Sequence, residues 1–172
     1  MAIKVGKKSR WLFVPVEVKV RELLAKILLA CKAAERGYTV VLGEAHAVRE
    51  MLYMLPAGVL MEKGVAPPKS EKFNRYRAMG NKIVSWCEEG LVFFDDEDYI
   101  RRKFNQDDLK IIECFFAWGK YQAKVVERHF PEMSKRIEIS GNPRLDLLRK
   151  EYRGIFQEEV DKLYDLYGDF IL

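Results

Sequence analysis

The sequence predicts an α/β fold of the Rossmann-like type, with an open, mostly parallel sheet and helices on both faces. Short runs rich in β-branched and aromatic residues alternate with amphipathic stretches, which is typical of βαβ units. The run 38–42 (YTVVL) is almost continuously apolar, as expected of a strand covered on both faces. With 172 residues and 49% hydrophobic content, the chain is long enough for one buried core. We therefore expect a single domain spanning residues 1–172.

The expected elements follow from apolar periodicity and from the Gly, Pro and Asn residues that separate the periodic segments. We expect strands at residues 11–16, 38–42, 58–61, 82–86, 109–116 and 136–140, and helices at 21–36, 44–54, 120–129 and 155–167. Two irregular stretches are expected to begin as loops. The stretch 65–80 turns helical after Ser70, and the stretch 91–106 contains a short basic helix.

The helix expected at 21–36 has a broad apolar face that should pack against the sheet. Its members at helical spacing are Leu23, Leu24, Ile27, Leu28 and Cys31.

The end of the chain allows two interpretations. Residues 169–172 (DFIL) read as the opening of another buried strand, which predicts that the chain stops before a second domain. A short edge strand that completes the present sheet explains them equally well.

Charge and composition exclude several classes of protein. The chain has 30 Lys and Arg residues and 26 Asp and Glu residues, and the positive charges are interleaved with acids along most of its length. Nucleic-acid binders more often cluster their basic residues, so no nucleic-acid partner is expected. The basic N-terminus is followed by Pro15, Glu17 and Lys19, which interrupt any apolar segment. We expect neither a signal peptide nor a membrane span.

The cysteines and histidines argue against a disulfide framework and a protein-bound metal. Cys31, Cys87 and Cys114 are odd in number and embedded in apolar sequence, so they are expected to be core residues in a reducing compartment. His46 and His129 lie far apart, and no CxxC or HExxH motif occurs.

Candidate functional residues lie in the turns that follow strands, because ligands of open parallel sheets bind beyond the carboxyl ends of the strands. Glu17 and Arg21 follow the first strand and could bind a polar acceptor, although a solvated helix N-terminus is the simpler explanation. Trp118 and Gly119 follow the fifth strand. The tryptophan suits stacking on a sugar, while sealing the core is its more usual role.

Two carboxylates, Glu88 and Glu89, end the fourth strand beside Gly90. One could accept a proton from an acceptor hydroxyl while its neighbour raises its pKa. An acid-rich surface turn is an equally good explanation. The acidic run 95–98 is expected to be a solvated loop, since four adjacent acids cannot converge on one metal ion. No GxGxxG fingerprint occurs, which disfavours a dinucleotide-binding oxidoreductase.

The strongest candidate turn is 140–146 (SGNPRLD). It combines a strand end, a glycine and a capped helix start that begins with proline. Such a turn can bind an anion or hold a contact between domains. Its candidate residues are Asn142, Arg144 and Asp146.

Four ordered blocks, which together cover most of the chain, resemble a known family. They are residues 15–43 (PVEVKVRELLAKILLACKAAERGYTVVLG), 88–92 (EEGLV), 116–131 (FAWGKYQAKVVERHFP) and 139–152 (ISGNPRLDLLRKEY). They resemble the bacterial surface carbohydrate biosynthesis proteins, which are similar to CDP-glycerol glycerophosphotransferases and other GT-B glycosyltransferases. The resemblance implies the N-terminal, acceptor-side half of a GT-B fold, followed in that family by a second Rossmann-like domain that binds the nucleotide-activated donor.

The resemblance also implies roles for the candidate residues. Glu88 or Glu89 would be the catalytic carboxylate beside the acceptor. The positions matching the family at strand ends, and so implied in substrate binding, are Glu17, Arg21, Trp118, Gly119, Asn142, Arg144 and Asp146. In the family an aspartate commonly precedes the two glutamates, whereas Cys87 stands there in this chain.

The expected function is acceptor binding in a cytoplasmic transferase of surface polysaccharide biosynthesis, with the isolated chain inactive. The expected partners are a carbohydrate acceptor and a C-terminal donor-binding domain or separate chain. No cofactor or metal is implied beyond the activated donor, and peripheral association with the inner face of the membrane stays open. The alternatives are a stand-alone module that binds a small anion or a nucleotide sugar, and an enzyme similar to UDP-sugar epimerases.

Overall fold

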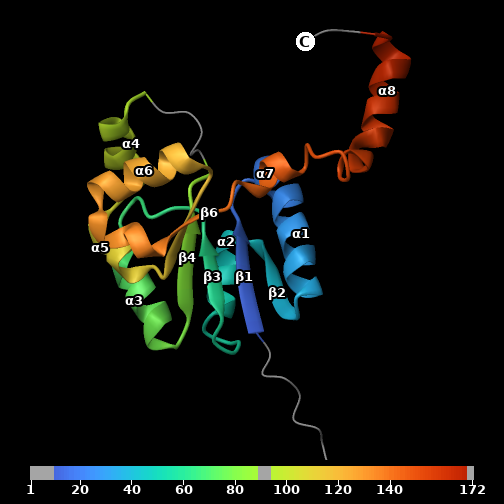
Figure 1. The fold of residues 1–172 in the computed structure, drawn as a ribbon. Coiled ribbons are helices and arrows are strands. Elements are labelled where there is room, and N and C mark those ends of the chain that lie inside the picture. The colour runs from blue at the N-terminus through green and yellow to red at the C-terminus, as the bar shows by residue number, and fades with distance from the viewer. Residues whose placement is uncertain (1–9, 89–93, 170–172) are drawn as a thin grey trace, which may run out of the picture.

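The computed structural model describes residues 10–88 and 94–169 and shows an open sheet of six strands, all parallel (Figure 1). The strand order is β2-β1-β3-β4-β5-β6. The strands are β1 (Arg10–Val16), β2 (Tyr38–Glu44), β3 (Val59–Glu62), β4 (Lys82–Trp86), β5 (Cys114–Ala117) and β6 (Ile137–Ile139). The predicted Rossmann-like α/β fold class is confirmed.

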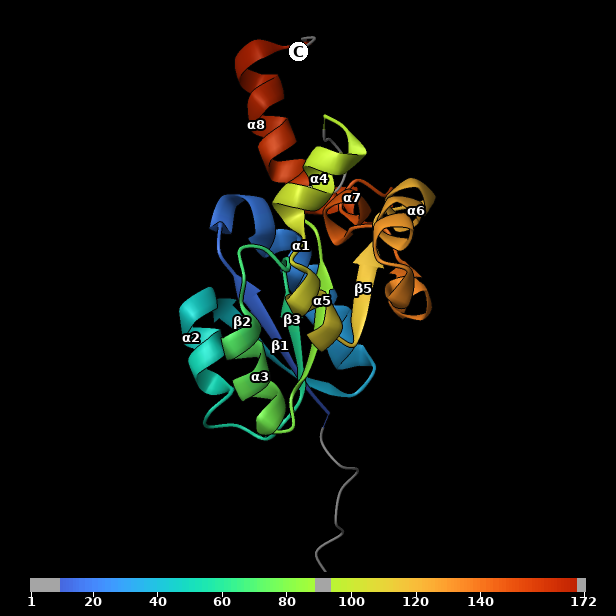
Figure 2. The ribbon, with the colours of Figure 1, turned by 90° about the vertical axis from the view of Figure 1, so that its left-hand side faces the viewer.

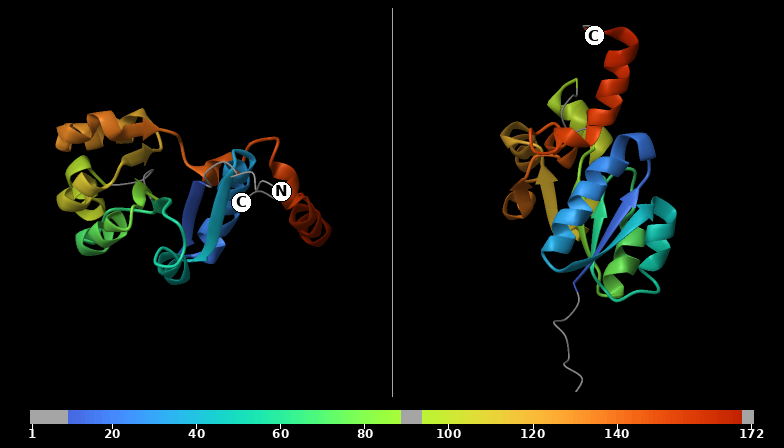
Figure 3. Two further views of the ribbon diagram at one scale, coloured as in Figure 1. Left: turned by 90° about the horizontal axis from the view of Figure 1, so that it is seen from below. Right: turned by 90° about the vertical axis from the view of Figure 1, so that its right-hand side faces the viewer.

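Helices alternate with the strands and cover both faces of the sheet. Helix α1 lies on one face, and α2 and α3 lie on the other (Figures 2 and 3). The helices are α1 (Lys19–Glu35), α2 (Ala45–Met51), α3 (Ser70–Ala78), α4 (Asp96–Lys103), α5 (Gln106–Ile111), α6 (Lys120–His129), α7 (Pro143–Asp146) and α8 (Gln157–Tyr167), with 3-10 turns η1 (Pro131–Arg136) and η2 (Arg153–Phe156).

Strand β1 is the point at which the direction of the chain across the sheet reverses. It pairs with β2 on one side and with β3 on the other, so that Phe13 lies opposite both Val41 and Leu60. Right-handed crossovers in opposite directions place α1 and α2 on opposite faces. The chain therefore has a topological switch point between β1 and β3, beyond the carboxyl ends of these strands.

The main core lies between the central strands and the helices of the α3 face. Phe13, Leu60, Ile83 and Phe115 on four neighbouring strands are fully or almost fully buried. Strands β1 and β3 also approach closely at Gly58, where an added Cβ would lie 2.5 Å from the Trp11 carbonyl oxygen. Only glycine fits this contact without a shift of the backbone.

The prediction of a strand at 109–116 is wrong over its first half. Residues Gln106–Ile111 form helix α5, and strand β5 begins at Cys114. Asn105 caps this helix, and its Oδ1 accepts a hydrogen bond from the Asp108 amide at 3.1 Å. Buried Leu109 and Ile111 suit either a strand or a short helix, and the cap decides between the two.

The face that α1 buries is not the predicted one. The helix turns Glu22, Ala25 and Lys26 toward the sheet, while Leu24 and Ile27 are 50% and 39% exposed. Cys31 is also exposed, so its assignment to the core is wrong, whereas Cys87 is buried and Cys114 is half-buried. Helical periodicity identified an apolar stripe correctly but not the direction in which it points.

The chain after β6 returns across the carboxyl edge of the sheet, and α7 packs on α1 (Figure 1). The final helix α8 then projects away from the body of the protein, and all its residues are exposed (Figures 1 and 3). The sequence allowed two interpretations of the apolar tail at 169–172. Most of that tail, residues 170–172, lies outside the described residues.

Candidate functional site

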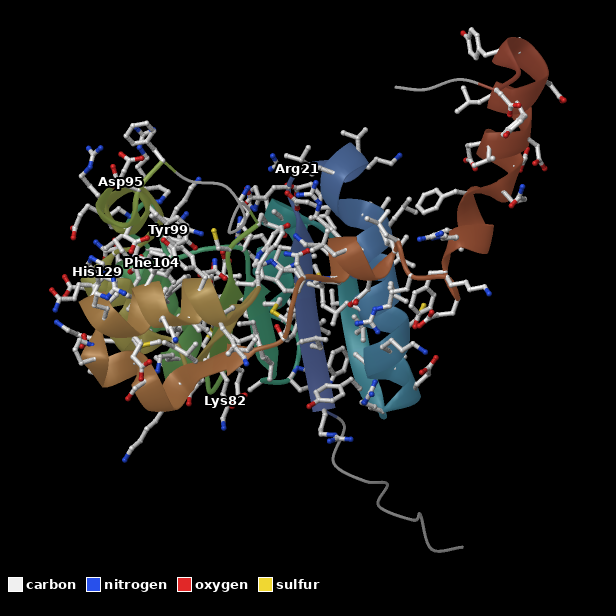
Figure 4. The ribbon with its side chains drawn as sticks, turned by 45° about the horizontal axis from the view of Figure 1, so that its top comes forward. Arg21, Lys82, Asp95, Tyr99, Phe104 and His129 are labelled. Carbon is white, nitrogen blue, oxygen red and sulfur yellow. The ribbon has the colours of Figure 1, made fainter. Side chains whose placement is uncertain are left out.

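The candidate site is a charged network at the carboxyl edge of the sheet, at the switch point between β1 and β3. Figure 4 shows Arg21 at this edge and Lys82 at the opposite one. The residues that follow β1, β3 and β4 all contribute to the network, because the carboxyl ends of parallel strands lie along one edge. Two groups of ion pairs make it up, one around Lys26 and one around Glu62.

The Lys26 cluster consists of Glu22, Lys26 and Glu88, each at most 6% exposed. Lys26 Nζ donates to Glu22 Oε2 at 2.8 Å and to the Pro15 carbonyl oxygen at 2.7 Å. It also lies 3.3 Å from Glu88 Oε1, which accepts a hydrogen bond from Trp86 Nε1 at 2.9 Å. One buried ammonium group therefore joins the end of β1, helix α1 and the loop after β4.

The Glu62 cluster consists of Glu62, Arg49, Lys69, Glu17 and Lys63. Glu62 is 1% exposed and accepts hydrogen bonds from Arg49 Nε at 2.8 Å and from Lys69 Nζ at 2.9 Å. Arg49 Nη2 also donates to Glu17 Oε1 at 3.1 Å, and Lys63 Nζ lies 2.5 Å from Glu17 Oε2. This cluster connects α2, the ends of β1 and β3, and the start of α3.

The network sets the protonation of its carboxylates. Burial by itself raises the pKa of Glu62, but the hydrogen bonds and charges of Arg49 and Lys69 outweigh it and hold that pKa below its ordinary value. Burial also opposes ionisation at Glu17, where the bonds to Lys63 and Arg49 again leave the pKa lowered. These groups are therefore anions at neutral pH.

Glu17 connects the two clusters. Its backbone amide donates to Glu22 Oε2 at 2.9 Å in the Lys26 cluster, while its carboxylate belongs to the Glu62 cluster. Its side chain is 31% exposed, compared with 23% for Arg49 and 30% for Lys63. The partly exposed side chains of Glu17, Arg49 and Lys63 form the accessible rim of an otherwise buried network. Along this rim, acceptors and donors of hydrogen bonds alternate.

Trp118 follows β5 and lies against the loop that carries Glu88. Its indole Nε1 donates to the Cys87 carbonyl oxygen at 2.5 Å, and its amide donates to Gln122 Oε1 at 2.7 Å. The ring is half-buried, and Gly119 is the residue that precedes helix α6. Trp118 therefore holds the backbone of Cys87, next to Glu88, while part of the Trp118 surface stays accessible.

The turn 140–146 is also tied to this edge. The amides of Ser140 and Gly141 both donate to the Ala117 carbonyl oxygen at the end of β5. Asn142 is 3% exposed and caps α7 by accepting the Arg144 amide at 2.9 Å, as predicted from the sequence. Its Nδ2 has no hydrogen-bond partner among the described residues.

The predicted site residues divide into three groups. Glu17, Glu88, Trp118 and Gly119 lie along the carboxyl edge, and Arg21 joins them, with Nη2 3.6 Å from Glu22 Oε1. Asn142 and Arg144 are carried back toward α1 by the turn. Asp146, in the same short helix α7, forms a local ion pair with Arg149 at 2.9 Å. Glu89, the third group, lies outside the described residues.

Six residues of the network were not found from the sequence. Lys26 and Glu22 form an i,i+4 pair opposite the apolar stripe of α1, which was a usable signal. Glu62 is the last residue of β3 and Lys63 follows it, so both lie directly after the predicted strand 58–61, at the same edge as the others. Arg49 and Lys69 carry no local signal, because only the fold brings them to Glu62.

The acidic run 95–98 is the start of helix α4 and not a loop. Asp95 caps the helix by accepting the Asp98 amide at 2.7 Å, and Asp98 pairs with Arg102 at 2.8 Å. Asp96 accepts a hydrogen bond from Tyr121 on α6 at 2.8 Å. These acids hold α4 against α6. Within residues 10–88 and 94–169, no three His, Cys, Asp or Glu side chains converge in a way that could hold a metal ion.

A cavity of about 370 Å³ lies at the opposite, amino edge of the sheet, lined in part by Arg10, Trp11, Tyr38 and Lys82. Its size suits a small ligand. However, the Arg10 guanidinium stacks on the Tyr38 ring and donates to the Arg36 carbonyl oxygen at the end of α1. Because this cation already compensates the C-terminal end of a helix, the carboxyl edge is the stronger candidate.

No family model, curated protein or solved structure matches this chain. Among the helices of the described segments, none has both the length and the apolar character needed to cross a membrane. The structure itself shows a Rossmann-like α/β domain with a largely buried network of charged side chains at the switch point.

Proposed function

We propose that this chain is the acceptor-binding domain of a GT-B-like transferase and that a polyhydroxylated acceptor binds at the carboxyl edge. The observation that carries the proposal is the alternation of Glu17, Arg49 and Lys63 on the accessible rim of the Glu62 cluster. Sugar hydroxyls both donate and accept hydrogen bonds, so neighbouring carboxylate and cationic groups match them in pairs. The resemblance to surface carbohydrate biosynthesis proteins points to the same chemistry.

The buried part of the network has the separate role of holding this rim in position. Charged groups that are already paired and buried lose little freedom when a ligand binds, which favours affinity. Trp118 adds a partly accessible aromatic surface close to Glu88. We assign donor binding to a second domain or a separate chain, in line with the family resemblance.

Binding to the chain itself tests this proposal. We expect methyl glucoside, a neutral acceptor mimic, to bind weakly, and Glu17→Gln to weaken this binding by about tenfold, which corresponds to about 1.4 kcal/mol. Glu158→Gln removes the same charge from the surface of α8 and should leave binding unchanged. Isothermal titration calorimetry measures both. If UDP binds and methyl glucoside does not, the acceptor-domain proposal is wrong and the chain is a module that binds a nucleotide sugar.

The proposed proton acceptors are Glu88 and Glu89. Both contacts described for Glu88 use Oε1, so neither engages its second oxygen, Oε2. In an enzyme that also contains the donor domain, we expect Glu88→Gln or Glu89→Gln to lower kcat by about 10²–10⁴-fold with a much smaller change in acceptor binding. Steady-state kinetics of the folded variants separates the two effects. Unchanged turnover in both variants would remove the catalytic assignment.

A further inference from the structure

The cavity of about 370 Å³ at the amino edge of the sheet is lined by the first residue of each of four neighbouring strands. Arg10 on β1 pairs with Tyr38 on β2, and Val59 on β3 pairs with Lys82 on β4. Val59 also pairs with Leu12, two residues after Arg10. Because paired residues and alternate residues of one strand share a face, these four lining side chains all lie on the same face of the sheet.

The apolar part of the lining comes from β3 and the two residues before it, and its backbone is held in place. Ala57, Gly58 and Val59 contribute to it. The Gly58 amide donates to Oδ1 of buried Asn81 at 2.9 Å, and the Gly58 carbonyl oxygen accepts the Lys82 amide at 2.9 Å. A ligand therefore meets a wall that needs little ordering, which favours binding.

The described residues that line the cavity include two cations, Arg10 and Lys82, and no acid. The Arg10 guanidinium lies 4.6 Å from the centroid of the Tyr38 ring and donates through Nη2 to the Arg36 carbonyl oxygen. A guanidinium carries five N–H groups, so others stay available to a ligand. Strand β3 separates β1 from β4, so the backbones of the two cations lie roughly 10 Å apart, with the apolar wall between them.

We propose that this cavity binds a small organic anion, namely a carboxylate with an apolar body. The carboxylate accepts charge-assisted hydrogen bonds from Arg10 and Lys82, and the apolar body lies against Ala57 and Val59. Lys82 lies at the edge of the sheet opposite to Arg21 (Figure 4). The inference therefore does not rest on the proposed function, because no residue of the Lys26 cluster or the Glu62 cluster takes part.

Nuclear magnetic resonance titration of the ¹⁵N-labelled chain with benzoate tests this proposal. We expect the amides of Arg10, Gly58 and Lys82 to shift. Benzamide has a similar shape without the charge, and inorganic phosphate has the charge without the apolar body. Each is expected to bind at least about tenfold more weakly than benzoate. The proposal is overturned if benzoate moves none of the three amides, or if either analogue binds as tightly as benzoate does.

Two variants test the cavity itself. Lys82→Gln removes one cation and should weaken benzoate binding by about tenfold. Ala57→Leu keeps both cations but fills part of the cavity, and should weaken binding at least as much. Lys124→Gln removes an exposed cation from α6 and should leave the affinity unchanged, as should Glu17→Gln at the opposite edge.

The dispersion of the amide signals establishes that each variant is folded, and Ala57→Val replaces Ala57→Leu if the latter is not. The proposal is overturned if the folded Lys82 and Ala57 variants bind benzoate as the unmodified chain does. It is also overturned if Glu17→Gln weakens benzoate binding, because the anion then binds at the carboxyl edge. Failure of methyl glucoside to bind leaves these results unchanged, so the two proposals fail separately.

Discussion

Replacing Lys26 with methionine is expected to lower the free energy of unfolding by about 3–5 kcal/mol, because it removes one partner from a buried ion-pair cluster. Lys26 is 2% exposed and is the cation that lies between Glu22 and Glu88. Methionine fills a similar volume, so the expected loss comes from two buried carboxylates that lose the cation between them. Glu22 keeps the longer contact with Arg21, at 3.6 Å. Urea unfolding followed by circular dichroism measures the change.

Two further variants separate charge from packing. Lys32→Met alters an exposed lysine on the same helix, and its surface pair with Glu35 predicts no measurable change. The double variant Glu22→Leu/Lys26→Met removes a charge of each sign and should recover part of the stability lost in Lys26→Met. A Lys26→Met protein as stable as the unmodified chain would show that the Lys26 cluster is not buried as described.

Glu62 is expected to contribute to the loss of stability in acid. Its pKa is lowered in the folded protein, because Arg49 and Lys69 outweigh the effect of burial. A carboxyl group with a lowered folded pKa stabilises the fold above its unfolded value of 4.5, and that contribution is lost as the pH falls through the folded value. Below about pH 5 the free energy of unfolding should therefore fall steeply.

Glu62→Gln should be less stable than the unmodified chain at pH 7 and less sensitive to acid. One proton fewer is taken up on unfolding, so the slope of stability against pH between the two pKa values should fall by about 1.4 kcal/mol per pH unit. Glu17 and Glu22 also have lowered pKa values and keep some slope in the variant. Glu159→Gln, at an exposed position on α8, should retain the unmodified slope. If stability falls with pH at the same slope in all three proteins, the pKa of Glu62 is not lowered in the folded protein.

The sequence predicted the architecture better than it predicted which groups face each other. Strand 82–86 and helix 120–129 have the predicted bounds, since apolar runs and turn residues define them locally. The orientation of α1 could not be predicted by hydrophobic periodicity, because this helix buries a charged face and exposes an apolar one. Burying Glu22 and Lys26 is favourable only with Pro15, Trp86 and Glu88 in place, and the fold alone supplies that arrangement.

The sequence predicted the edge of the sheet at which the charged network lies, but not the full set of residues that form the network. Strand-to-helix turns indicated Glu17, Glu88 and Trp118, which lie along the carboxyl edge. The Glu62 cluster was missed because its members come from four segments separated by up to 52 residues, Glu17 to Lys69. Charged residues such as Arg49 look like ordinary surface residues until their partners are known.

The place where a ligand binds decides whether the carboxyl edge is the acceptor site, and nuclear magnetic resonance titration of the ¹⁵N-labelled chain with methyl glucoside locates it. If the carboxyl edge is the acceptor site, the shifted signals are the amides of Glu17, Lys63 and Trp118 and the Trp118 indole, and Glu17→Gln needs about tenfold more methyl glucoside to produce the same shifts. If the signals that move are instead those of Arg10, Tyr38 and Lys82, the ligand binds the cavity at the amino edge and the proposed site is wrong.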